Sequence, residues 1–283
     1  LFIFEPVQEH IIHTKHLFPV LDEMLIALLQ SLTEEEWRKP TIAKQWTVKD
    51  IAAHLLDTNL RTLSFARDRH LLQPDIPIEN NADLITYLNK LNAEWVKAAS
   101  RLSTTVLIDL LKSSGHAFCD FMQKADLHAD AIFSVAWAGE ATSKNWFHIA
   151  REYTEKFIHQ QQIRDAVNRP GLLTRELFYP FIDTFMRALP YTYSDINAPD
   201  GTLIAVTVSS EAGGTWLLKR NNSNWSLVAA DKTQPAAHVT IEPSIAWKLF
   251  SKGITPAEAA QQVVITGDTT LGAIALNMIS VMA

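Results

Sequence analysis

The chain of 283 residues is poor in the residue types that several common kinds of site require. Its single cysteine, Cys119, excludes a disulfide within the chain and a zinc site built from cysteines. The nine glycines form neither a phosphate-binding loop nor the Gly-x-Ser-x-Gly turn of serine hydrolases. Cys119 lies among apolar residues of an expected helix, so we interpret it as a small buried side chain rather than a nucleophile.

Excess positive charge and long apolar runs are also missing. The formal net charge of -6 lacks the excess of positive charge that is typical of nucleic-acid-binding proteins. The apolar residues 1–4 lack a basic lead and are followed by Glu5 and Pro6, so we expect neither a signal peptide nor a membrane span there. These features predict a cytoplasmic protein without nucleic-acid or membrane partners, and we expect a monomer or homodimer.

The first two-thirds of the sequence have apolar residues at helical spacing. A capping box, Thr33 with Glu36, opens a short helix that ends before Pro40. Residues 131–138 are expected to form a short strand or an extended connection. The other expected helices cover residues 8–32, with a kink or break at Pro19, and residues 47–70, 82–100, 103–127, 146–168 and 175–189. This pattern predicts an up-and-down, four-helix-type bundle over residues 1–189.

Beyond an expected linker at residues 190–199, apolar residues alternate with a period of two. The expected strands are residues 202–208, 215–218, 225–228, 237–241 and 263–265, and the expected helices are residues 243–251, 256–261 and 269–281. Because short turns join the strands, we expect an antiparallel sheet with helices on one face. The sequence therefore predicts an α+β protein, with the bundle followed by a smaller α+β domain at residues 196–283.

Three residues on two of the expected helices are candidate metal ligands. Glu155 and His159 are four residues apart, so they project from one side of the helix at residues 146–168. His54 lies beside the apolar face of the helix at residues 47–70. Two histidines and one glutamate from two packed helices leave coordination positions open, which is typical of a catalytic metal site.

Each of these residues also has a simpler interpretation. A single histidine near an apolar face is more often a hydrogen-bonded core residue, and an isolated Glu-x-x-x-His pair is usually a solvated helix pair. A second histidine group competes for the metal. His10, His13 and His16 are three residues apart and form either a surface metal site or a partly exposed polar edge.

Polar neighbours of the candidate ligands suggest substrate contacts. Asp57 and Arg61 follow His54 on one helical flank, where they either orient His54 and meet an anionic substrate or form an ordinary ion pair. His148 lies eleven residues before His159 on the same helical face, where it either contacts the substrate or the surroundings of the metal or has a capping or core role. We take Arg61 and His148 as candidate contacts for a carboxylate, because their polar groups suit an anion.

Taken together, these motifs resemble the mycothiol-dependent maleylpyruvate isomerases, which belong to the wider DinB-like metal-binding bundles. The resemblance is carried by Trp46, the segment Asp50-Ile51-Ala52-Ala53-His54-Leu55, Trp146, Glu155-x-x-x-His159 and Asp165. It implies that His54, Glu155 and His159 hold a divalent metal, most often zinc, with nickel or another metal as alternatives. Trp46 and Trp146 flank these ligands and either belong to the core, like most of the eight tryptophans, or wall the pocket.

The resemblance extends to the end of the chain. Residues 263–271, Val-Val-Ile-Thr-Gly-Asp-Thr-Thr-Leu, look like the sterol-carrier-protein-like domain that follows the bundle in those isomerases. It implies a metal-dependent enzyme that uses a low-molecular-weight thiol to isomerise or conjugate a small, anionic electrophile. The C-terminal domain is the expected cover for the open side of the metal. The alternatives are hydrolysis by metal-activated water and a non-catalytic, metal-stabilised protein that binds a small molecule or lipid.

Overall fold

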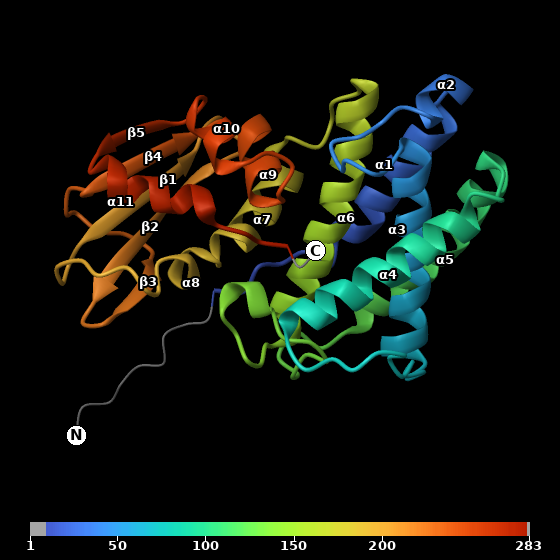
Figure 1. The fold of residues 1–283 in the computed structure, drawn as a ribbon, viewed down its shortest axis with the longest axis horizontal. Helices are drawn as coiled ribbons and strands as arrows, with labels where there is room; N and C mark the ends of the chain where they lie inside the picture. The colour runs from blue at the N-terminus through green and yellow to red at the C-terminus, as the bar shows by residue number, and fades with distance from the viewer. Residues whose placement is uncertain (1–9, 282–283) are drawn as a thin grey trace.

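The computed structural model describes residues 10–281, so residues 1–4, expected to be neither signal nor membrane span, lie outside the described part. Among the described residues, four helices form the bundle, in which α1 and α3 each pack against both α5 and α6, and a fifth helix, α4, lies against α3 (Figure 1). Their bounds are α1 Leu17–Gln30, α3 Val48–Thr62, α4 Asn81–Ala99, α5 Thr104–Lys124 and α6 Asn145–Val167. The predicted helical bundle is present.

The helix ends follow local chemistry. Thr33 and Glu36 form the expected capping box of α2 (Glu34–Trp37), and Thr47 and Asp50 form another at α3. Helix α1 begins later than predicted because Pro19, its third residue, is tolerated in a first turn whose N–H groups have no helical partner.

Two predicted segments differ from the structure. The helix expected at residues 47–70 changes after Thr62 into a π-helical turn, η1, at Leu63–Arg67. Residues 131–138 contain no strand; they end in a short 3-10 helix, η2, at Ala136–Ala138. Neither difference can be predicted from the spacing of apolar residues, since both depend on which backbone N–H and C=O groups form hydrogen bonds.

The C-terminal part contains a five-stranded sheet in the order β3-β2-β1-β4-β5. The strands are β1 Leu203–Val208, β2 Gly214–Asn221, β3 Asn224–Val228, β4 Ala237–Ile241 and β5 Val264–Gly267. Three of the four pairings are antiparallel as expected, but β1 and β4 are parallel. The expectation of a wholly antiparallel sheet is wrong at this pair, because residues 229–236 carry the chain back across β2 and β1 before β4 starts.

Helices pack on one face of this sheet (Figure 1). They are α7 Arg175–Met186, α8 Leu189–Thr192, α9 Pro243–Phe250, α10 Pro256–Ala260, α11 Thr269–Ala273 and the 3-10 helix η3 Ile274–Asn277. Val206 and Val239 of the sheet belong to the same buried cluster as Phe250 of α9. On the other face, Thr207 bonds to Thr215 and to His238. The final helix is shorter than the expected residues 269–281.

Helix α7 joins the bundle to the sheet. Its Phe181 stacks on Phe157 of α6 with the ring centroids 4.3 Å apart, and its Asp183 accepts a 2.7 Å hydrogen bond from Trp216 of β2. One buried cluster therefore runs from the bundle through α7 into the sheet. Helix α8 occupies the start of the predicted linker. The division into domains at residues 1–189 and 196–283 stays a prediction.

Within residues 10–281, no helix combines the length and the apolar character that crossing a membrane requires.

Candidate functional site

The packing of α3 against α6 brings the three candidate ligands together. The imidazole centroids of His54 and His159 lie 4.6 Å apart in an edge-to-face arrangement. Nε2 of His159 lies 3.6 Å from Oε2 of Glu155, one helical turn earlier. Residues separated by a hundred positions in the sequence thus form one cluster at the contact between two helices.

A neighbouring amide fixes the orientation of His159. Its Nδ1 lies 3.0 Å from Oε1 of Gln162, which is buried on the next turn of α6. An Nδ1–H that donates to this oxygen leaves the lone pair of Nε2 available on the side of Glu155. Metal-binding histidines commonly have this arrangement, with the second ring nitrogen held by a hydrogen bond.

His54 is buried, and its Nδ1 has no hydrogen-bond partner among the described residues. Burial holds the pKa of His54 well below its ordinary value, and electrostatic interactions with the neighbouring His159, Arg61 and Lys156 lower it further. The ring is therefore neutral at pH 7. A neutral imidazole with an unpaired buried nitrogen has the protonation state that a metal ion requires.

Glu155 supplies the negative charge of the cluster. Burial alone would raise its pKa, but the adjacent His159 imidazole and the charges of Arg151 and Lys156 outweigh this and leave the pKa below its ordinary value. The carboxylate is ionised at neutral pH. Two neutral imidazoles and one carboxylate are a common donor set for zinc in catalytic sites.

The three side chains carry the atom types that bind a divalent metal, and they lie close to one another. Two atoms bound to one zinc at about 2.1 Å in tetrahedral geometry lie about 3.4 Å apart, close to the 3.6 Å between His159 and Glu155. Over residues 10–281, however, no three His, Cys, Asp or Glu side chains already stand at ligand positions. A metal therefore requires some side-chain adjustment, so the metal site itself remains a proposal.

An aromatic ring covers the cluster on one side. The ring of Trp46 lies 4.8 Å from that of His54 and 6.2 Å from that of His159, so this residue walls the site. Trp146 does not: it stacks on Phe147 at 5.0 Å, in a separate buried cluster with Val135. Of the two alternatives for Trp146, the structure favours the core role, because its position at the start of α6 is two turns from Glu155.

The two candidate anion contacts already have protein partners. Arg61 forms a 3.0 Å ion pair with Asp57 and a 2.8 Å hydrogen bond to Asn92 of α4. His148 is hydrogen-bonded at 3.1 Å to Arg151, and no hydrogen bond links it to the three ligands. Arg61 and His148 as substrate contacts therefore stay proposals.

The rival histidine group has a different environment. Nε2 of His10 lies 3.6 Å from the buried carboxylate of Asp183 in α7, and His16 precedes the first turn of α1. No arrangement of His10, His13 and His16 that could hold a metal is present among the described residues.

The sequence matches the model of one protein family, the mycothiol maleylpyruvate isomerase N-terminal domain, over residues 19–164. This match spans just over half of the chain and includes all three candidate ligands. The chain belongs to this family. A comparison with curated proteins found no match.

Two solved structures related to the mycothiol maleylpyruvate isomerase family have a similar fold. Both are crystal structures of the mycothiol-dependent maleylpyruvate isomerase, one of them a histidine-to-alanine mutant. Each is 11% identical to this chain, over 89% of this chain and 91% of the other. The TM-scores are 0.53 for the first and 0.52 for the mutant, so the likeness extends from the bundle into the C-terminal part.

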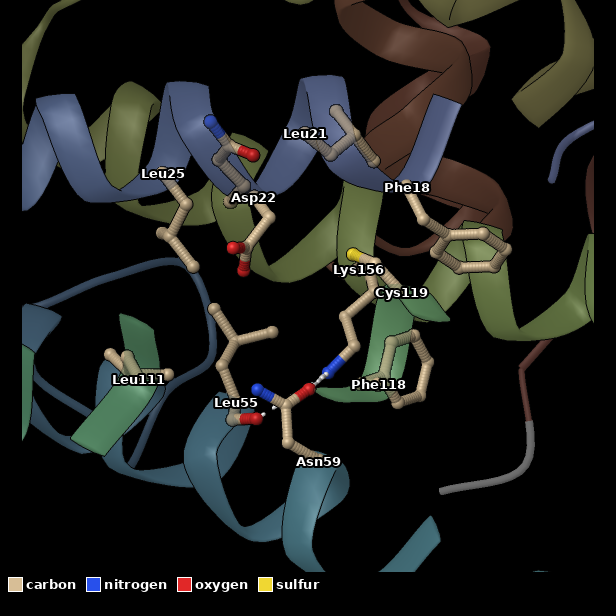
Figure 2. A pocket seen from close by; sticks show the side chains of 11 residues that line it. Phe18, Leu21, Asp22, Leu25, Leu55, Asn59, Leu111, Phe118, Cys119 and Lys156 are labelled. Carbon is tan, nitrogen blue, oxygen red and sulfur yellow. Dashed lines mark hydrogen bonds between the residues drawn. The ribbon is translucent and has the colours of Figure 1, made fainter. Parts of the chain in front are cut away.

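In this member of the family, charged groups also occupy the interior of the bundle (Figure 2). Asp22 of α1, Cys119 of α5 and Lys156 of α6 line a cavity of about 20 Å³, room for about one water molecule. Burial lowers the pKa of Lys156 to about 8 and raises that of Asp22 to about 6. It also raises the pKa of Cys119 to about 12, so the group is a thiol at neutral pH, as expected for a residue that is not a nucleophile.

Sequence reasoning missed three residues of this region: Arg151, Lys156 and Gln162. Arg151 contributes to the low pKa of Glu155, Gln162 orients His159, and Lys156 is buried against α3. A signal for Lys156 was available. It directly follows Glu155 on a helix whose inward positions otherwise carry mostly apolar or amide side chains. Gln160, one turn later, is one of these amide residues.

Asp22 is expected to make stability depend on pH. Its folded pKa of about 6 lies above the ordinary 3.8, so the folded state binds more protons between these values and loses stability as the pH rises through that window. Asp22→Asn should therefore raise the Tm by a few degrees at pH 7 and have little effect at pH 4. Circular dichroism melts at several pH values measure this difference.

The matched control is Asp109→Asn, which changes an exposed carboxylate on α5. Its melts should follow the unmodified protein at every pH. A Tm difference for Asp22→Asn that is the same at pH 4 and pH 7 would show that the Asp22 carboxyl does not titrate in this range.

Proposed function

We propose that this protein is an enzyme that depends on a divalent metal and a low-molecular-weight thiol, and that isomerises or conjugates a small anionic electrophile. His54, Glu155 and His159 are the proposed metal ligands, with zinc as the first metal to test. The observation that carries the proposal is the cluster itself: a neutral buried His54, an oriented His159 and an ionised Glu155, within a chain of this family.

A bound dication with two neutral imidazoles and one carboxylate has a net charge of about +1, which lowers the pKa of a thiol. The chain's own residues supply what surrounds this chemistry. Trp46 and the packing of α3 on α6 keep water from one side of the imidazoles. Because the described part offers no ionised thiol, with Cys119 protonated and buried, the thiol is expected to come from outside.

The names of the related structures suggest the first substrates to try. They are called mycothiol-dependent maleylpyruvate isomerases, so mycothiol with maleylpyruvate is the first pair, followed by other thiols and electrophiles. Protein purified without a metal-affinity column should contain about one divalent metal, and activity should need both metal and thiol. Metal binding without turnover of any pair would favour the non-catalytic binding alternative.

Contacts that α9 and the turn after it make with α6 and the 40–46 loop make the C-terminal part a candidate cover for the site. Ile42 of this loop lies against Gly253, and Lys248 of α9 forms a 3.1 Å ion pair with Asp165 of α6. Both contacts lie near the end of α6 that carries His159. We propose that this side of the C-terminal part limits the access of water to the open side of the metal.

Arg61 tests the anionic nature of the substrate. Its side chain is about one-third exposed, so a carboxylate in solution can approach it while it keeps its bonds to Asp57 and Asn92. Arg61→Ala should raise KM for an anionic substrate roughly tenfold or more, with the metal affinity nearly unchanged. Steady-state kinetics and zinc titration measure the two quantities.

Two controls accompany this change. Arg67→Ala removes an arginine of the following turn that pairs only with its neighbour Asp68, and it should leave KM unchanged. Asp57→Asn breaks the ion pair but keeps the Arg61 guanidinium. If Asp57→Asn raises KM as much as Arg61→Ala does, Arg61 acts by holding α3 and α4 in place rather than by binding substrate.

A further inference from the structure

A lysine links the two helices that carry the proposed metal ligands. Nζ of Lys156, on α6, lies 2.7 Å from Oγ1 of Thr58, 2.5 Å from Oδ1 of Asn59 and 3.4 Å from the carbonyl oxygen of Leu55. All three acceptors belong to α3. Figure 2 shows the lysine side chain reaching from α6 across the bundle interior to Asn59.

The position of this link along both helices matches that of the ligands. Leu55 follows His54 directly on α3, and Lys156 follows Glu155 directly on α6. Successive residues of a helix point about 100° apart, so neighbours on the chain project to different sides. Lys156 therefore faces the interior cavity, while Glu155 and His159 face His54 on the other side of the same helix contact.

A partly buried ammonium group is a costly way to hold two helices together, because it loses hydration. Replacing such a group together with its partners by apolar side chains is often neutral or stabilising. The ammonium group adds a geometric constraint that an apolar side chain lacks, because hydrogen bonds are directional. Its hydrogen bonds, together with the Phe118 ring 4.6 Å away, fix how far α6 slides and turns relative to α3.

We propose that Lys156 is a positioning residue, which sets the register of α6 against α3 and thereby the distance of His54 from Glu155 and His159. The inference rests on the proposed metal function of that cluster. It explains why a charged residue occupies a position where packing alone would favour an apolar one, beside a cavity that is not completely filled.

Lys156→Met tests this role, with Co²⁺ as the probe because its visible spectrum reports ligand geometry. The affinity for Co²⁺ should fall about 10- to 100-fold, the range seen when a residue that supports a metal ligand is lost. The absorption bands of the bound ion should also change. The Tm of the metal-free protein should fall by only a few degrees, because relief of the desolvation of the ammonium group offsets part of the cost of leaving its acceptors on α3 without a donor.

The matched control is Lys49→Met. Lys49 also lies on α3 and donates to two carbonyl groups, those of Ser100 and Leu102, at 3.0 and 2.7 Å. It ties α3 to the link between α4 and α5 rather than to α6. Its loss should lower the Tm slightly and leave both the affinity and the Co²⁺ spectrum unchanged.

A second variant approaches the same link from the other helix. The double change Thr58→Val with Asn59→Leu removes two of the three acceptors and keeps Lys156 in place. Asn59 also donates to Ser114, so Ser114→Ala serves as its control. The double variant should weaken Co²⁺ binding as Lys156→Met does, and this keeps the test decisive if Lys156→Met fails to fold.

The outcomes separate the two proposals. If His54→Ala binds Co²⁺ as well as the unmodified protein does, or if neither binds it, the metal function fails and the inference fails with it. If His54→Ala loses binding while Lys156→Met keeps the full affinity and the same spectrum, the metal function stands and the positioning role is overturned.

Discussion

Replacing Glu155 by glutamine is expected to abolish tight zinc binding while the bundle remains folded. The carboxylate is the only negatively charged member of the ligand cluster, and its neutral amide is a poor ligand for a divalent ion. Affinity should fall at least about a hundredfold, since even the residues that support a ligand cost 10- to 100-fold. His54→Ala should have a similar effect, because it removes the ligand contributed by α3.

Isothermal titration with zinc and thermal melts of the metal-free protein measure the two effects separately. His148→Ala is the matched control, because it changes a histidine of α6 that bonds to Arg151 and not to the cluster. It should leave zinc affinity intact. Unchanged zinc binding by Glu155→Gln would remove Glu155 from the ligand set, and unchanged binding by both ligand variants would end the metal proposal.

Zinc affinity should also fall as the solution becomes acidic, because protons compete with the metal for the ligand atoms. The pKa of His54 is held well below its ordinary value, so this imidazole remains neutral to lower pH than a solvated histidine does. Competition between protons and metal at this position is therefore weak at pH 7.

The second large effect is expected on stability, from Phe157→Ala. In the sequence, Phe157 lies between Glu155 and His159. Its side chain is fully buried and faces α7, where its ring stacks on that of Phe181 with the ring centroids 4.3 Å apart. Removing a buried aromatic ring costs about 3–5 kcal/mol, which lowers the Tm by roughly 10 °C in a chain of this size. Because the buried cluster continues through α7 into the sheet, we expect one transition for the whole molecule.

Two signals should therefore move together. Far-ultraviolet circular dichroism reports mainly the helices, and fluorescence includes Trp216 and Trp247, which are buried in the C-terminal part. Leu110→Ala, at an exposed position of α5, should change either signal by little. A melt of Phe157→Ala in which the helical signal shifts and the C-terminal tryptophans do not would show that the two parts unfold independently.

Helix positions were the most predictable part of this structure. Side-chain caps such as Thr47 with Asp50 mark a helix start in the sequence itself, and apolar spacing marks the buried face. The parallel pairing of β1 with β4 was not predictable in this way. The sequence of each strand predicts which of its faces is buried, but it does not predict which strand lies beside it.

The candidate site was predictable in part, for a similar reason. The four-residue spacing of Glu155 and His159 shows that they share a helix face, whereas His54 was a candidate only from its place beside an apolar helix face and from the family resemblance. The sequence offered a signal that Lys156 lies on the inward side of its helix, but not its role, because a lysine in a helix is normally solvated. Only the packing of α3 on α6 shows that its ammonium group is enclosed.

The place of α7 has a consequence for how such proteins are built up from parts in evolution. The segment recognised as the family domain, residues 19–164, ends before α7. Yet α7 covers the aromatic side of α6: it stacks on Phe157, and its Leu177 carbonyl accepts a 2.7 Å hydrogen bond from Tyr153. A gene fragment that ended at residue 164 would expose this surface and promote aggregation. The smallest portable piece is therefore the bundle with α7, and any partner fused behind it must offer an apolar surface to the far side of that helix.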